Sequence, residues 1–154
     1  AKHFPGHGDT DVDSHKALPT LPFDRARLDA IELYPFQEAI NQDVWMVMVG
    51  HLNVPALDPT GMPSSLSYPI VTKLLKEEMG FKGIVVTDAL GMKGVSTYMP
   101  AEMVPLASFK AGSDMLLMPV KNISTFNSPT FIFVLYNDNT PSPAGMGSCV
   151  MLPF

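Results

Sequence analysis

The sequence predicts an α/β fold built around a parallel sheet. Three apolar runs, at residues 44–49, 84–87 and 115–118, are rich in β-branched residues or Met and do not alternate with polar residues. Such runs are typical of strands that are buried on both faces of a parallel sheet. Segments with helical spacing lie before the first run and between the runs. This order of helices and strands is that of βαβ units.

Proline and glycine mark the ends of the expected helices. Residues 24–40 carry helical signals that break at Pro35. Residues 69–79 place apolar side chains at helical spacing, with a proline in the first turn and a glycine after the last. The third expected helix, residues 102–111, has Pro105 in its first turn, where a missing amide proton is tolerated.

A polar or unusual residue follows each predicted strand: His51, Asp88 and Pro119, in that order. Functional side chains lie at the carboxyl ends of parallel strands in both barrels and open sheets. A (β/α)8 barrel takes eight strands and about 250 residues, so we expect the 154 residues to form part of a TIM barrel. Residues 121–154 break the pattern with polar and proline clusters around a β-like run at 131–136.

Composition excludes several classes of protein. The chain is 46% hydrophobic and 16% charged, which indicates a folded domain. Fifteen acidic and ten basic residues give a net charge of -5, and no cluster of Lys and Arg offers a surface for nucleic acid. The apolar runs are far shorter than the roughly 20 residues that span a bilayer, so we expect no membrane span. The single cysteine, Cys149, and the start at Ala1 leave the compartment open between periplasmic or secreted and cytoplasmic.

The densest concentration of reactive side chains is residues 3–15, which hold three of the four histidines and three aspartates. Alternating aspartates at 9, 11 and 13 suggest a calcium loop, although Ser14 and Thr20 replace its glycine and glutamate. The histidines could instead ligate zinc, although their spacing matches no helix-borne pair. The short GxG of Gly6 and Gly8 is a weak phosphate-loop signal without the lysine of a P-loop.

An acid–base pair is a further interpretation of the same segment. Asp13 and His15 are two residues apart in an expected loop, so their side chains can project to the same side. A carboxylate next to an imidazole favours the protonated form that a general acid needs. Asp88 is either a turn or helix-capping residue or a catalytic carboxylate. His51 has a weaker case, as a substrate contact or as an orienting residue, and so has Asp58.

The residues 2–19 resemble the signature KHFPGHGx4DSHx3P of glycoside hydrolase family 3 β-N-acetylglucosaminidases, also called β-N-acetylhexosaminidases, at all of its positions. Residues 83–92, GIVVTDALGM, are similar to the nucleophile segment of the family. The resemblance implies that residues 1–120 form strands 5 to 8 of a TIM barrel, its C-terminal half. Residues 121–154 would be a divergent or irregular tail.

The resemblance also implies roles for individual residues. Asp88 would be the nucleophile, with Asp13 and His15 as the acid–base pair. Lys2 and His3 would bind sugar hydroxyls. We also place His51 among the expected substrate-binding residues.

The function implied is that of a retaining exo-glycosidase that releases β-linked N-acetylglucosamine from peptidoglycan fragments or chitooligosaccharides, without a metal or other cofactor. Peptidoglycan recycling would be one setting for it. The alternatives are a fragment that binds carbohydrate or a partner without catalysis, and a metal-dependent hydrolase that uses the histidines. Half a barrel exposes strand edges and apolar helix faces. We therefore expect this chain alone to be inactive, and to need the other half of the barrel or self-association.

Overall fold

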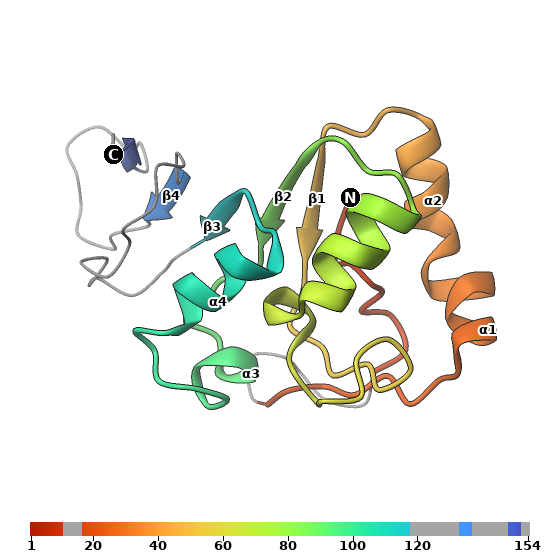
Figure 1. Cartoon of the computed structure of the whole chain (residues 1–154), viewed down its shortest axis with the longest axis horizontal. Coiled ribbons are helices and arrows are strands. Elements are labelled where there is room, and N and C mark those ends of the chain that lie inside the picture. The colour runs from red at the N-terminus through yellow and green to blue at the C-terminus, as the bar shows by residue number, and fades with distance from the viewer. Residues whose placement is uncertain (11–16, 118–132, 137–147, 152–154) are drawn as a thin grey trace.

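The computed structural model describes residues 1–10 and 17–117, together with the backbone of two strands at 133–136 and 148–151 (Figure 1). In chain order the elements are α1 (Arg25–Arg27), η1 (Leu28–Glu32), α2 (Tyr34–Asn41), β1 (Met46–Val49), η2 (Ser64–Leu66), η3 (Pro69–Glu78), β2 (Ile84–Thr87), α3 (Lys93–Ser96), α4 (Val104–Ala111), β3 (Met115–Leu117), β4 (Phe133–Tyr136) and β5 (Ser148–Met151). The helix η2 is 3-10, and η1 and η3 are π-helical.

The strands form one sheet in the order β1-β2-β3-β4-β5. The pairs from β1 to β4 are parallel, and β4 and β5 are antiparallel. Helix η3 lies over β1 and β2, and α4 lies beside it near β3 (Figure 1). The predicted α/β class with a parallel sheet is therefore confirmed, whereas β5 was not predicted.

Residues 1–4 extend the sheet beyond the outer edge of β1. The terminal ammonium of Ala1 donates to the carbonyl of Met46 at 2.8 Å. The amide of Phe4 donates to the carbonyl of Met48 at 2.8 Å, and the amide of Gly50 donates to the carbonyl of Phe4 at 2.9 Å. This pairing is parallel, so the end of residues 1–4 reaches the same edge of the sheet as the end of β1.

The expected helices form close to their predicted bounds. Asp24 caps α1 by accepting a hydrogen bond from the amide of Arg27 at 2.8 Å. The expected helix over 24–40 is interrupted at Leu33, because Pro35 takes a place in the first turn of α2. Helix α4 begins two residues later than predicted, at Val104, and the short α3 was not predicted.

The core explains why the strands are apolar. Val47, Val49 and Val85 pack against apolar side chains of η3 and the helices before β1. Leu116 of β3 belongs to a second cluster with side chains of η2 and α4. On the other face of the sheet, Met46 is 37% exposed and Ile84 is 43% exposed. The prediction that the strands are buried on both faces is thus wrong for these two residues, because the described helices cover one face.

A glycine at the end of α4 allows close packing between α4 and η3. Gly112 ends α4 in the left-handed region at φ 112°, and a Cβ there would overlap Oγ1 of Thr72 in η3. That hydroxyl donates to the carbonyl of Ala111 at 2.7 Å. Gly80, after η3, has φ 75° but no atom near the position of a Cβ.

We predict that Gly112→Ala destabilises the protein more than Gly80→Ala does. Each loses about 1 to 2 kcal/mol because an L-residue is strained in the left-handed region, and only Gly112→Ala also displaces Thr72. Urea unfolding of both variants measures the difference. Equal losses would show that the contact between α4 and η3 tolerates a methyl group.

Candidate active site

Asp88 lies directly after β2, with its carboxylate at the carboxyl edge of the sheet. Its amide donates to the carbonyl of Val49 at 2.8 Å, which ties it to the end of β1. Its Oδ1 accepts a hydrogen bond from the amide of Ala89 at 2.8 Å, and its side chain is 17% exposed. Helix capping does not explain this carboxylate, because the N-cap residue of α3 is Met92.

The second carboxylate oxygen of Asp88 faces His3. Nε2 of His3 is 3.8 Å from Oδ2 of Asp88, which is an ion-pair distance but too long for a hydrogen bond. Burial lowers the pKa of His3, the charge of Asp88 partly counteracts this, and Lys2 and His7 lower the pKa further. The imidazole of His3 is therefore mainly neutral near pH 7.

His51 is fully buried behind Asp88. Its Nε2 lies 3.0 Å from the carbonyl oxygen of Ala89, and its Nδ1 lies 2.7 Å from Oγ of Ser65. A carbonyl only accepts, so Nε2 carries the proton and the hydroxyl of Ser65 donates to Nδ1. With both nitrogens bound inside the protein, the geometry favours the orienting role for His51 over the expected contact with substrate.

Burial also governs the charge of His51. Burial has the largest effect and lowers the pKa of His51. The hydrogen bond to Ala89 and the charge of Asp88 raise this pKa by less, and His3 lowers it further, so the net shift is downward. His51 is thus neutral at neutral pH, which matches the single proton that its two hydrogen bonds require.

Asp58 lies in a separate environment. Its carboxylate accepts hydrogen bonds from Oγ of Ser67 at 2.5 Å, from Oγ1 of Thr60 at 2.6 Å and from the amide of Thr60 at 3.0 Å. Burial would raise its pKa, but these donors outweigh burial and hold the pKa of Asp58 below its usual value. Asp58 therefore fixes the chain between β1 and η3.

The segment 2–9 borders a cavity of about 360 Å³. Its charged or titratable lining residues are Lys2, His3, His7, Asp9, Arg27 and Glu32. Sequence analysis missed the last two. Glu32 stands four residues after Leu28 on the buried side of the helix, so a carboxylate at an apolar position was the signal that could have identified it.

The metal alternatives depend on the histidines and aspartates of residues 3–15. Within residues 1–10 and 17–117, no three His, Cys, Asp or Glu side chains are arranged to hold a metal ion. Asp9 forms an ion pair with Arg27 instead. Asp13 and His15 lie outside the described residues, so their expected acid–base pairing stays a prediction. In the same described part of the chain, no helix has the length and apolar character to cross a membrane.

The structure therefore brings together three of the residues singled out from the sequence. His3 lies within residues 1–4, His51 follows β1, and Asp88 follows β2. These three segments are neighbours in the sheet. Lys2 is exposed and lines the adjoining cavity with His3.

Comparison with known proteins decides the family. Residues 1–132 match the sequence model described as the N-terminal domain of glycosyl hydrolase family 3. The chain belongs to glycoside hydrolase family 3. The match runs past residue 120, where the resemblance was expected to end, and it does not test the prediction of strands 5 to 8.

Relatives within family 3 carry hexosaminidase names. Beta-hexosaminidase A of Pseudoalteromonas piscicida is 42% identical over 130 residues, which cover 77% of this chain and 22% of that protein. A beta-hexosaminidase of Shewanella frigidimarina is 36% identical over 118 residues, covering 76% of this chain and 34% of the relative. The chain thus spans only about a fifth to a third of the length of these family 3 proteins.

Solved family 3 structures have the same fold. A β-N-acetylglucosaminidase from Paenibacillus sp. str. FPU-7 superimposes with a TM-score of 0.73 at 46% identity, covering 75% of this chain and 22% of that one. The β-N-acetylglucosaminidase from Thermotoga maritima gives a TM-score of 0.68 at 32% identity, covering 76% and 25%.

We predict that His51 makes this family 3 chain less stable in mild acid. The pKa of His51 in the folded chain lies below the unfolded value of about 6.5. At pH values between these two pKa values, the unfolded chain therefore binds more protons than the folded chain. The contribution of neutral His51 to the free energy of unfolding is fully present above this pH interval and decreases as the pH falls through it. Urea unfolding at pH 7.5, 6 and 5 measures this loss.

The variant His51→Asn should reduce the pH dependence, and His3→Asn should remove a smaller part, because His3 is less buried. A dependence that is unchanged by His51→Asn would show that protonation of this side chain does not limit stability.

Proposed function

We propose that this chain supplies catalytic residues for retaining hydrolysis of β-linked N-acetylglucosaminides. The observation that supports this most is the carboxylate of Asp88 at the end of β2, with one oxygen held by Ala89 and the other facing His3. The hexosaminidase names of the relatives support the substrate class.

In this proposal, Asp88 is the nucleophile. Its Oδ2 attacks the anomeric carbon, the bond from that carbon to the leaving oxygen breaks, and a glycosyl ester forms. Water then cleaves the ester and restores the carboxylate. The hydrogen bond from Ala89 to Oδ1 keeps the other oxygen directed toward the sugar.

His15 serves as the acid that protonates the leaving oxygen and then as the base that deprotonates the water, with Asp13 as its orienting carboxylate. This assignment rests on the match of the DSH segment to the family signature. A histidine with a carboxylate partner suits both steps, because its pKa lies near the working pH.

Lys2 and His3 bind hydroxyl groups of the sugar. Both are accessible beside the cavity, and a mainly neutral His3 can donate one hydrogen bond and accept another. His51 acts indirectly, since it binds the carbonyl of Ala89, the residue whose amide donates to Asp88.

We further propose that residues 1–120 correspond to strands 5 to 8 of a TIM barrel, and that residues 121–154 are a divergent or irregular tail. Residues 1–4, β1, β2 and β3 are parallel neighbours in chain order, as successive barrel strands are. In this arrangement Asp88 follows strand 7. Peptidoglycan fragments and chitooligosaccharides are the substrates with the required linkage, and no cofactor is needed.

We predict that, when the other half of the barrel is supplied, Asp88→Asn lowers turnover of an aryl β-N-acetylglucosaminide by several powers of ten, because an amide cannot form the glycosyl ester. Asp29→Asn, which removes a carboxylate from the surface of η1, serves as the control and should keep full activity. A 2-fluoro sugar should label the peptide that contains Asp88. A covalent adduct on a different peptide would contradict the assignment.

Two outcomes would favour the other functions. Binding of N-acetylglucosamine without turnover, with the other half of the barrel supplied, would indicate a non-catalytic carbohydrate-binding role. Loss of turnover on treatment with EDTA would indicate a metal-dependent hydrolase.

We predict that His15→Ala affects poor leaving groups far more than good ones. An aryl group of low pKa departs without protonation, whereas a sugar alcohol needs the acid. Comparing kcat/KM for a nitrophenyl and a disaccharide substrate measures this. Equal losses on both would exclude His15 as the acid.

A further inference from the structure

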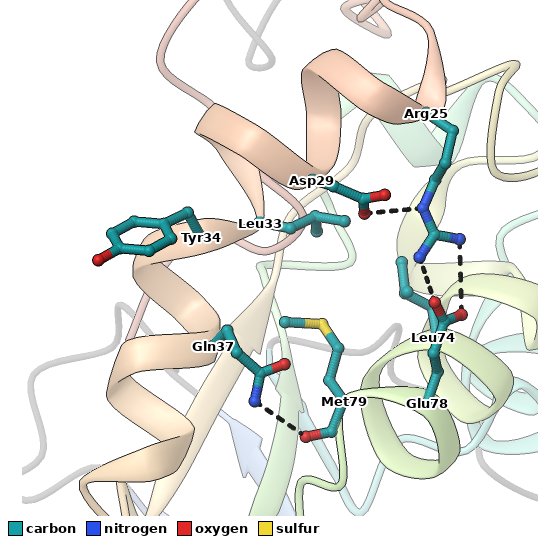
Figure 2. Close-up of a pocket in the computed structure, with 8 residues that line it drawn as sticks. All are labelled: Arg25, Asp29, Leu33, Tyr34, Gln37, Leu74, Glu78 and Met79. Atoms are coloured by element: carbon teal, nitrogen blue, oxygen red, sulfur yellow. Dashed lines mark hydrogen bonds and ion pairs between the residues drawn. The ribbon is translucent and has the colours of Figure 1, made fainter.

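Helix α1 carries two arginines that each pair with one aspartate and one glutamate. Arg25 pairs with Asp29 at 2.8 Å and with Glu78 of η3 (Figure 2). All three side chains are at least 43% exposed. Such exposed pairs contribute little to stability.

The second arginine makes a different kind of cluster. One terminal nitrogen of Arg27 lies 3.0 Å from Oδ2 of Asp9 and 3.0 Å from Oε1 of Glu32. The guanidinium also stacks on the ring of Phe23 at 4.1 Å. The side chain of Glu32 is only 5% exposed, in contrast to the exposed carboxylates around Arg25. We call Asp9, Arg27 and Glu32 the Arg27 network.

The burial of Glu32 is costly. Its Oε2 is buried without a hydrogen-bond partner, and so is Nε of Arg27. A buried charge of this kind destabilises a fold unless it is fully paired, and an apolar residue would serve packing better. Packing alone therefore does not account for a glutamate at this position.

The Arg27 network contacts the segment that carries His3 and His7. Gly6 has φ 136°, and a Cβ there would lie 2.8 Å from Cβ of Glu32. The backbone at Gly6 thus rests directly on Glu32, and Asp9, three residues later, is bound by Arg27. Gly6 and Asp9 are therefore the two points at which the segment is held against η1 and α1.

A short series of contacts leads from this segment to Asp88. The amide of Gly6 donates to the carbonyl of His3 at 2.9 Å. The rings of His3 and His7 meet edge to face with their centroids 6.1 Å apart. Nε2 of His3 then faces the carboxylate of Asp88 at 3.8 Å. A shift of Gly6 would therefore move the imidazole that faces Asp88.

We propose that the Arg27 network positions the segment from His3 to Asp9, and so sets the orientation of His3 toward Asp88 and the sugar. This rests on the proposed function, because it assigns the network a purpose in catalysis. Its members are positioning residues that act through the segment from His3 to Asp9.

The test uses two pairs of matched substitutions. Glu32→Gln is compared with Glu78→Gln, since each removes an arginine-paired glutamate. Asp9→Asn is compared with Asp29→Asn, since each removes an arginine-paired aspartate. Displacement of a catalytic geometry by about 1 Å can cost on the order of 100-fold in rate. With the other half of the barrel supplied, we expect kcat to fall on the order of 10- to 100-fold in Glu32→Gln and Asp9→Asn, and to stay unchanged in both controls.

A second measurement does not depend on turnover. The imidazole Hε1 NMR signals of His3 and His7 should shift in Glu32→Gln and Asp9→Asn, while that of the buried His51 stays in place. A change confined to His3 and His7 distinguishes positioning from a general loss of structure. The conservative Asp9→Glu should restore both the signals and kcat.

Several results would overturn the proposal. One is that the two variants lose no more activity than their controls, and another is that the His3 and His7 signals do not move. If Glu32→Gln does not fold, Asp9→Asn decides, because the side chain of Asp9 is 66% exposed. Absence of turnover in the unsubstituted protein when the other half of the barrel is supplied would refute the proposed function, and the histidine signals would still show whether the network positions the segment.

Discussion

Parallel backbone pairing among residues 1–4, β1 and β2 is the constraint on which the rest of the structure depends. Parallel strands end at the same edge of a sheet, so the residues that follow them become neighbours. His3, His51 and Asp88 are far apart in the sequence, and this pairing alone brings them to one edge. The hydrogen bond from the amide of Asp88 to Val49 shows how directly the sheet fixes the candidate nucleophile.

The side chains around Asp88 differ in what burial does to them. His51 is fully buried, is held neutral, and uses both nitrogens to join η2 to Ala89, the residue after Asp88. His3 is partly accessible and faces the carboxylate directly. One histidine therefore supports the site and the other is available to a ligand, a division that results from their depth in the fold.

Buried carboxylates show the same dependence on surroundings. Asp58 is surrounded by donors that stabilise its charge, so its burial contributes to the fold. Glu32 has one oxygen paired with Arg27 and the other without a partner. The contrast indicates that the first carboxylate serves stability, whereas the second is retained for its effect on the segment beside it.

The sequence by itself determined the features that depend on neighbouring residues. Pro69, Pro105 and Gly112 set helix ends through their own backbone preferences, and the apolar runs predicted the three central strands. The family followed from the contiguous signature at residues 2–19. Tertiary structure decided which ring nitrogens of His51 are bound and by what, and which carboxylates pair with Arg27. These contacts join segments distant in the chain or depend on depth in the fold, and no local pattern encodes either of them.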